Sequence, residues 1–211
     1  MTDQVAKAYW ETLAARYRDS QLSLAAEQGA NLAALRRGLG KPAGSVPEMW
    51  RFYTTLRDEP SQEPHPRLVA EHATLTVFGL HQQGQDKPMH RAGVHLGRAM
   101  SVLRNASIKQ GGGEDAAASL DRRFAAAATA LSMNEAVEHI RRLVTLLRRE
   151  GQPLDYTALC TSLRWWHDPQ SRARTRRHWA SGYFTTQKPG DDPGARVQPS
   201  ASGKNSNSQS I

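Results

Sequence analysis

Apolar side chains recur at helical spacing along nearly the whole chain, and this periodicity restricts the possible folds more than any other feature. In segment 4–18, for example, Tyr9, Leu13 and Tyr17 lie four residues apart and therefore share one helical face. No stretch shows the sustained alternation of apolar and polar residues that a half-buried strand needs. Helices of this kind bury their apolar faces by packing on one another. We therefore predict an all-α protein.

Glycine- and serine-rich stretches mark the expected boundaries. The sequence "SIKQGGGED" places three glycines between two helical patterns, which is typical of a flexible connection. In the last segment, Pro, Gly, Ser and Asn replace the bulky apolar residues, so little surface can be buried to offset the entropy of ordering. We predict two small helical bundles at 1–106 and 115–187, a glycine-rich connector at 107–114 and a disordered C-terminal tail at 188–211.

Candidate N-caps support the helix assignment. They are Ser45, Ser132, Asp155 and Asp168. The two serines are each followed three residues later by a glutamate, which is the spacing of a capping box. Asp168 is followed by proline, a residue favoured at the first helical position. We expect helices at 4–18, 47–56, 66–81, 94–104 and 115–131, with further helices starting after Ser132, Asp155 and Asp168.

The large aromatic residues indicate where the core lies. We place in the core Trp10, Trp50, Tyr53 and Phe78. Trp165 and Trp166 are adjacent, so they cannot both face the core, and we expect one of them at the surface or at a contact between domains or subunits. Cys160 follows Leu159 on an apolar helical face and is expected to be a small core residue.

The charge of the chain points to a polyanionic partner. The 211 residues carry a formal net charge of +8, and 22 of the 28 basic residues are arginine. The planar guanidinium group matches the geometry of phosphate, so an arginine-rich basic surface is typical of nucleic-acid binding. Net charge alone does not establish this, because a basic protein can simply be soluble.

The sharpest feature is the stretch "HIRRLVTLLRRE". On a helix with about 100° per residue, its arginines form one strip roughly 120° wide, while Ile140, Leu143 and Leu147 lie opposite. Solvated helix faces usually mix charges of both signs, because like charges one turn apart repel. We therefore expect this strip to meet an external polyanion. It consists of Arg141, Arg142, Arg148 and Arg149.

Other arginines stand at informative places. Arg36 and Arg37 end a predicted helix, where the helix dipole already favours cations. Arg67 lies in a first turn, where a cation is disfavoured, so its presence suggests a function. Arg98 follows Gly97, a small residue that would let a partner approach. Arg123 belongs to the sequence "LDRRF".

Sequence patterns for catalysis are missing. No two histidines have the spacing of a zinc protease motif, and there is no glycine-rich phosphate loop. The acidic residues do not cluster as a magnesium-dependent nuclease would require. No apolar run approaches the ~20 residues of a membrane helix, and the single cysteine excludes an intrachain disulfide. We expect a soluble cytoplasmic protein without catalytic residues, metal or cofactor.

The order of several motifs resembles a known family. The series "LAALRRG", "MWRFYTTL", "HPRLVAEHATLTVFGLH", "GVHLGRAMS" and "EHIRRLVTLLRREGQPLDYTALCTSLRWW" is similar to the CasB family, the small subunit of the type I-E CRISPR surveillance complex Cascade. The resemblance covers residues 8–186. It implies an all-helical, non-enzymatic protein used in antiviral defence. It also implies two copies packed head to tail, in contact with other Cascade subunits.

The resemblance further implies a role in nucleic-acid binding. The family holds the guide RNA–target heteroduplex and the displaced DNA strand through backbone contacts. Its groove positions match Arg37 in "LRRG", Arg67 in "HPRL" and Arg142 in "IRRL". The match extends to Arg36, Arg98, Arg123 and Arg141. The glycine-rich connector and the Ser/Asn-rich tail depart from the family pattern.

Two alternative functions remain open on the sequence. A stand-alone DNA-binding regulator would read the major groove with a helix-turn-helix, for which segment 156–179 is the nearest candidate. A helical nuclease is the second alternative, and it would show cleavage that depends on a divalent metal.

Overall fold

The computed structural model describes residues 7–20, 28–56 and 64–184. Within these ranges the regular structure is helical, and an isolated parallel bridge joins His90 to Leu154. The prediction of an all-α protein is confirmed. The start of the first expected helix, at residues 4–6, and the expected tail at 188–211 lie outside the described residues.

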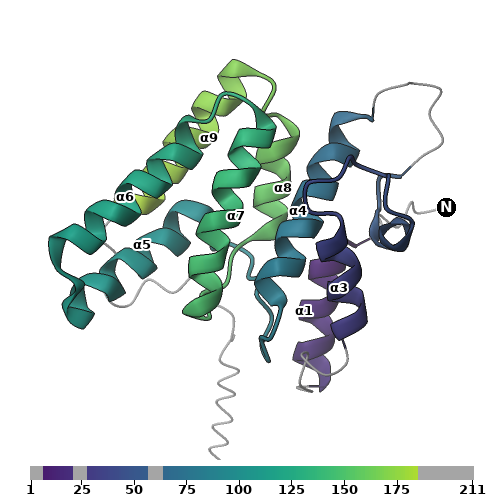
Figure 1. Ribbon diagram of the computed structural model, residues 1–211, viewed down its shortest axis with the longest axis horizontal. Coiled ribbons are helices and arrows are strands. Elements are labelled where there is room, and N and C mark those ends of the chain that lie inside the picture. Colours follow the sequence, from purple (N-terminus) through teal and green to yellow (C-terminus); the bar gives the residue numbers. More distant parts are fainter. Residues whose placement is uncertain (1–6, 21–27, 57–63, 185–211) are drawn as a thin grey trace, which may run out of the picture.

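The α-helices occupy most of the described chain (Figure 1). They are α1 (Tyr9–Ser20), α3 (Gly29–Arg37), α4 (Pro66–Gln82), α5 (Leu96–Ser107), α6 (Gly113–Thr129), α7 (Met133–Arg149), α8 (Tyr156–Arg164) and α9 (Pro169–Phe184). A 3₁₀-helix, η1 (Pro47–Phe52), and a π-helical turn, η2 (Ile108–Gly112), complete the list.

The helices form two groups that share a common middle. Figure 1 shows α5, α6 and α9 on one side and α1, α3 and α4 on the other, with α7 and α8 between them. α4 is enclosed by α3, α7 and α8, and every residue from Ala70 to Gly79 is buried. One hydrophobic cluster runs through both groups.

The connection between α5 and α6 is compact. Residues 108–112 form the π-helical turn η2, and the left-handed backbone at Gly111 (φ 84°) and Gly113 (φ 64°) reverses the chain direction. α5 precedes this turn in sequence, yet it packs against α6 and α9, which follow it. The domain boundary at 107–114 therefore remains a prediction.

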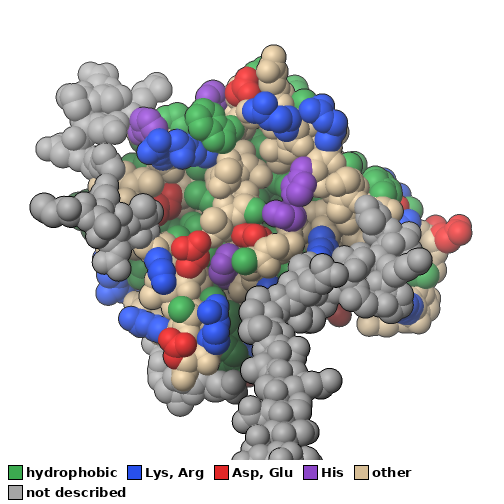
Figure 2. Space-filling view, turned by 180° about the vertical axis from the view of Figure 1, so that it is seen from behind, with side chains coloured by type: hydrophobic (Ala, Val, Ile, Leu, Met, Phe, Trp, Pro, Cys, Tyr) green, Lys and Arg blue, Asp and Glu red, His purple; other side chains and the backbone are tan. Residues whose placement is uncertain are grey.

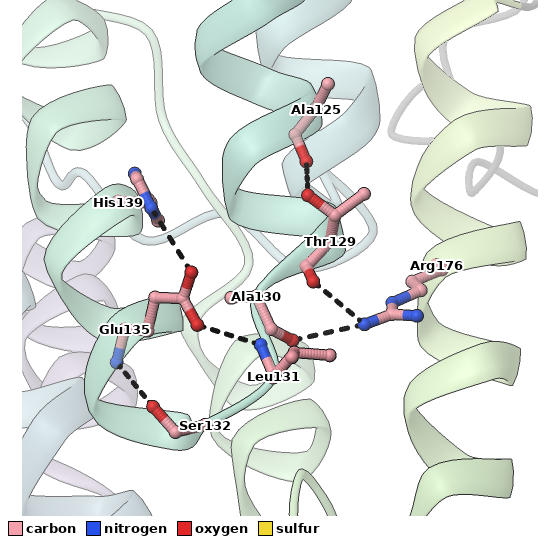
Figure 3. Close-up of polar contacts among 8 residues, drawn as sticks. All are labelled: Ala125, Thr129, Ala130, Leu131, Ser132, Glu135, His139 and Arg176. Atoms are coloured by element: carbon pink, nitrogen blue, oxygen red, sulfur yellow. Dashed lines mark hydrogen bonds and ion pairs between the residues drawn. The ribbon is translucent and has the colours of Figure 1, made fainter.

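Three of the four predicted N-caps are made. The Ser132 hydroxyl accepts a hydrogen bond from the Glu135 amide at 3.2 Å, and the Glu135 carboxylate accepts one from the Leu131 amide at 2.9 Å (Figure 3). Asp155 accepts from the Ala158 amide at 2.9 Å. Asp168 accepts from the Ser171 amide at 2.7 Å in the same way. These contacts explain why α7, α8 and α9 begin where they do.

The capping box at Ser45 is wrong. The Ser45 hydroxyl donates to the Pro42 carbonyl at 2.7 Å, and Glu48 pairs with Arg37 instead of reaching back to the helix start. The predicted helix at 47–56 is the short 3₁₀-helix η1, which begins after Val46 without a side-chain cap.

Two of the five residues predicted to lie in the core are buried, and so is one of the two adjacent tryptophans. Trp10 and Phe78 are enclosed, and Trp166 is fully buried while its neighbour Trp165 is 46% exposed. The assignment of Trp50 to the core is wrong, because the residue is 51% exposed and its Nε1 donates to the Gly44 carbonyl.

Two further core predictions hold in part. Tyr53 is half-buried, and its hydroxyl lies 2.7 Å from Nδ1 of His72. Cys160 is also half-buried and packs against the core, where burial raises the pKa of its thiol to about 11.

Candidate nucleic-acid interface

Helix α7 carries the four arginines of the predicted strip. Its apolar side is fully buried at Ile140, Leu143, Val144 and Leu147, as the sequence periodicity predicts. It packs against α4 on one side and against α6 on the other (Figure 1). Its polar face therefore forms a ridge with one depression on each side, and the arginines of the predicted strip are divided between these two sides.

The structure divides the four-arginine strip. The guanidinium group of Arg148 donates to the Leu80 carbonyl at 3.3 Å and to Oε1 of Gln83 at 3.1 Å, so it satisfies the C-terminal end of α4. Arg148 therefore has contacts within the chain, and its place on an interaction surface remains a prediction. Arg141 forms a surface ion pair with Glu138 at 3.5 Å. Arg142 and Arg149 are exposed.

A hollow of about 480 Å³ lies between α6 and α7. It is lined by Ser119, Arg122, Arg123, Ala126, His139 and Arg142. A second hollow of about 410 Å³ continues it toward the C-terminal end of α7, where Arg149, Leu146 and Glu150 contribute. Ser119 and Arg123 line both hollows. We call this continuous depression the α6–α7 groove, defined by Arg122, Arg123, His139, Arg142 and Arg149.

Nearly all charged residues that line the groove are positive. No carboxylate is among the residues that line the first hollow, and Glu150 is the acidic residue lining the second. Asp121 precedes the two α6 arginines, but its carboxylate faces Arg104 at 2.8 Å and the Tyr183 hydroxyl at 2.5 Å. The hydrogen bond from Arg104 is the main reason that the pKa of Asp121 is lowered. This acid therefore stabilises the contact of α6 with α5 and α9.

His139 occupies the wall of the groove near the start of α7. Its Nε2 lies 4.0 Å from the Glu135 carboxylate, which also accepts the Leu131 amide (Figure 3). The same capping box that begins α7 therefore also lies next to the groove.

The groove unites two of the predicted site residues. Arg123 and Arg142 line the same hollow although they lie 19 positions apart in the sequence. Arg149 belongs to the predicted arginine strip, two turns after Arg142, whereas Arg122 and His139 were not predicted to be site residues. The sequence gives no signal for the partner helix that brings Arg122 alongside α7.

Arg37, Arg67 and Arg36 lie elsewhere. Arg37 ends α3 and pairs with Glu48 at 3.3 Å, with 61% of its side chain exposed. A surface pair of this kind contributes little, about 0–1 kcal/mol, so the guanidinium group stays accessible. Arg67 is exposed in the first turn of α4, and Arg36 is half-buried.

A separate hollow of about 520 Å³ lies on the α4 side of α7. Its lining includes Gly38 and Lys41 from the loop after α3, Val69 from α4, and Glu138 from α7. Arg141 pairs with Glu138, which lines this hollow, whereas Arg37 and Arg67 are not among the lining residues. Arg123 and Arg142 therefore line the α6 side of α7, while Arg141 lies next to the hollow on its α4 side.

Arg98 lies at the junction of α5 and α9. A Cβ atom on the neighbouring Gly97 would lie 1.9 Å from the Trp179 carbonyl oxygen, and one on Gly182 would lie 3.1 Å from the Arg98 amide nitrogen. The close approach that Gly97 permits is therefore that of α9 in the same chain. Arg98 does not line the α6–α7 groove.

Two arginines of α9 hold the fold together. Arg176 donates to the carbonyls of Thr129 and Ala130, each at 3.1 Å (Figure 3), and Arg172 donates to the Leu131 carbonyl at 2.9 Å. These contacts satisfy carbonyls at the C-terminal end of α6, where a cation is also favoured by the helix dipole. Much of the basic charge of α9 is therefore structural.

The face of the molecule that is turned away from the viewer in Figure 1 carries mixed charge. Figure 2 shows separate groups of Lys and Arg side chains there, with acidic, histidine and apolar side chains between them. In the described segments no cluster of three or more His, Cys, Asp or Glu residues could hold a metal ion. None of the described helices is long and apolar enough to cross a membrane.

The model of one protein family, CRISPR-associated protein Cse2, matches residues 31–184 of the chain. The chain belongs to the Cse2 family. This match spans most of the sequence, from within α3 to the end of α9. It confirms the resemblance to CasB that the motif order indicates.

Solved structures of Cse2 and CasB proteins share the fold. CasB from Thermobifida fusca is 29% identical, with a TM-score of 0.59 over 85% of this chain and 100% of that chain. A Cse2-family CRISPR-associated protein from Thermus thermophilus is 20% identical, with a TM-score of 0.57 over 84% and 99%. CasB from M. ruber is 20% identical, with a TM-score of 0.56 over 84% and 94%. No curated protein sequence matches the chain.

Proposed function

We propose that this Cse2-family protein is a non-catalytic subunit of a type I-E Cascade complex in the cytoplasm, where it binds nucleic acid without reading its sequence. Its ligands are the guide RNA–target heteroduplex and the displaced DNA strand, and its protein partners are the other Cascade subunits and a second copy of itself. The family membership and the α6–α7 groove support this proposal.

The observation that carries the proposal is the composition of the α6–α7 groove. Arg122, Arg123 and Arg142 line one hollow together, and the other lining residues are serine, alanine and histidine. This hollow offers guanidinium groups for phosphates, and neither a Phe, Tyr or Trp platform nor an Asn or Gln side chain lines it. Such a surface favours backbone contacts, which supply affinity without sequence selectivity.

The alternative of a helix-turn-helix regulator is disfavoured by the packing of α9. Trp179 is buried beside Trp166, with ring centroids 5.6 Å apart, and Arg172 and Arg176 are held by the end of α6. A recognition helix needs its polar face free to enter the major groove. Here two of the arginines that would contact DNA already stabilise the fold.

The proposal is tested by charge reversal at two exposed groove positions. We expect the variant Arg142→Glu/Arg149→Glu to bind DNA duplexes of unrelated sequence at least tenfold more weakly than the parent protein in electrophoretic mobility shifts. The matched control is Arg177→Glu, an exposed arginine of α9 outside the groove. Equal binding by the double variant and the parent would refute the assignment of the groove, and a strong preference for one sequence would refute backbone recognition.

A further inference from the structure

Another basic hollow lies against α1, away from the α6–α7 groove. Its volume is about 650 Å³. One wall is a single face of α1 together with Lys7, and the opposite wall is the loop between α4 and α5 together with Pro153. We call it the α1 hollow. Its lining residues are Lys7, Glu11, Ala14, Ala15, Tyr17, Arg18, Lys87, Pro88, His90, Arg91, Ala92 and Pro153.

Positive charge predominates in the α1 hollow. Lys7 and Arg18 stand on the helix wall, and Lys87 and Arg91 stand on the loop wall. Glu11 is the carboxylate among the lining residues, and both of its oxygens are engaged. Oε1 accepts the Thr157 hydroxyl at 2.7 Å and Oε2 accepts the Ala8 amide at 3.3 Å. On the side of the molecule where α1 lies, Figure 2 shows basic side chains with acidic and histidine side chains between them.

The loop wall is held in place by a buried amide. Gln82 is fully buried, and its Nε2 donates to the carbonyls of Gln85 at 3.1 Å and Lys87 at 2.8 Å. Its Oε1 accepts the Met89 amide at 2.8 Å. The nitrogen and the oxygen of this side-chain amide therefore both form hydrogen bonds with the loop that carries Lys87. A binding wall fixed before the ligand arrives loses less entropy on binding.

The remainder of the loop is fixed to the start of α8. The Leu154 amide donates to the Met89 carbonyl at 3.0 Å, and the Arg91 amide donates to the Leu154 carbonyl at 3.1 Å. The Gly93 amide donates to the Asp155 carboxylate at 2.7 Å. These three hydrogen bonds therefore fix the position of the loop relative to the start of α8.

The α1 hollow differs from the α6–α7 groove in having a tyrosine side chain. Tyr17 is half-buried and lies on the helix wall one residue before Arg18. Proline and alanine form the remaining apolar lining. Cations that follow a backbone, combined with an aromatic face on which a base can stack, are the features of single-strand binding. From Tyr9 to Arg18 the α1 wall extends roughly 13 Å along the helix axis, which is long enough for a few nucleotides.

We propose that the α1 hollow is a second nucleic-acid site, which takes a short single-stranded segment with its phosphates on the four cations and a base against Tyr17. The site is separate from the α6–α7 groove, and the proposal shares with the proposed function only the class of ligand. The α1 wall precedes residue 31 and therefore lies outside the segment that the family model matches. The two hollows would let one chain hold a strand and a duplex at the same time.

The test is photochemical cross-linking of the full-length protein to a single-stranded oligonucleotide that contains 5-iodouracil, followed by mass spectrometry. We expect an adduct on Tyr17. The variant Arg18→Glu/Lys87→Glu should lose that adduct and bind labelled oligo(dT) at least tenfold more weakly. Both substituted residues are exposed, and urea unfolding checks that the variant is folded. Arg142→Glu/Arg149→Glu is the matched control and should retain the Tyr17 adduct.

Each outcome separates this inference from the proposed function. Adducts confined to α6 and α7 would overturn the α1 hollow as a nucleic-acid site and leave the groove in place. Undiminished oligo(dT) binding by Arg18→Glu/Lys87→Glu would overturn the inference as well. Loss of Cascade assembly by that variant, with oligo(dT) binding intact, would identify the hollow as a contact for an acidic protein segment and would overturn the inference. Adducts nowhere on the chain would overturn the α1 hollow as a single-strand site and leave the α6–α7 groove to its own duplex-binding test.

Discussion

Protonation of His81 should limit the acid stability of this protein. The side chain lies on α4 and is fully buried, with Nδ1 2.8 Å from the Tyr156 hydroxyl, while its Nε2 has no hydrogen-bond partner among the described residues. Burial is the main reason that the pKa of His81 is lowered from 6.5 to about 3. The folded protein therefore keeps this imidazole neutral where the unfolded chain would protonate it.

The magnitude follows from proton linkage. Because the folded-state pKa is depressed, stability is fully present above the unfolded pKa of 6.5 and is lost as the pH falls below it, down to the folded value of about 3. Each pH unit in this window removes about 1.4 kcal/mol, so lowering the pH from 7 to 5 should remove about 2 kcal/mol through His81. His72, His90 and His95 also have lowered pKa values because of burial, and they add to the loss in the parent protein.

Urea unfolding at pH 7 and pH 5 measures the effect of His81 when parent and variant are compared. His81→Gln keeps a side chain that can bond to the Tyr156 hydroxyl but cannot titrate. The variant should therefore lose about 2 kcal/mol less than the parent between the two pH values. If the free energies of unfolding of parent and variant fall by the same amount, His81 is not the buried neutral group described here, and the reasoning is refuted.

Two packing predictions concern α9. Gly97→Ala would place a methyl group 1.9 Å from the Trp179 carbonyl oxygen, so α5 and α9 must separate, and we expect a loss of about 1–3 kcal/mol in urea unfolding; an unchanged midpoint would contradict the close crossing. Arg176→Ala removes a charged donor from the Thr129 and Ala130 carbonyls, which should cost about 1.5–3 kcal/mol. Unaltered stability of that variant would show that the Arg176 contacts do not hold α9 to α6.

The sequence predicted those features that depend on local periodicity. The apolar face of α7, its Ser132 cap and the caps at Asp155 and Asp168 follow from spacing alone, because each involves residues within a few turns of one helix. That only one of Trp165 and Trp166 is buried was predicted on the same basis.

The remaining features depend on contacts between distant segments. Arg148 belongs to the same helical strip as Arg142, but only the approach of α4 shows that it is used to satisfy Leu80 and Gln83. Glu71 gave no signal in the sequence, yet its buried carboxylate accepts the amides and hydroxyls of Thr54 and Thr55.

The candidate site was likewise predictable from the sequence only in part. Sequence indicated that arginines on α6 and α7 are exposed to a polyanion, but it could not show that Arg123 and Arg142 share one hollow. Nor could it show that hydrogen bonds from the buried Gln82 side chain hold the loop that carries Lys87 next to α1. Both arrangements arise from helix packing, to which residues far apart in the chain contribute.

The salt dependence of duplex binding tests the α6–α7 groove most directly. Each phosphate contact contributes about 0.9 to the slope of log affinity against log salt on B-form DNA. Removal of two contacts by Arg142→Gln/Arg149→Gln should therefore flatten the slope by about 1.8 relative to the parent, for duplexes of any sequence. A slope equal to that of the parent protein would contradict the claim that these guanidinium groups meet the phosphates.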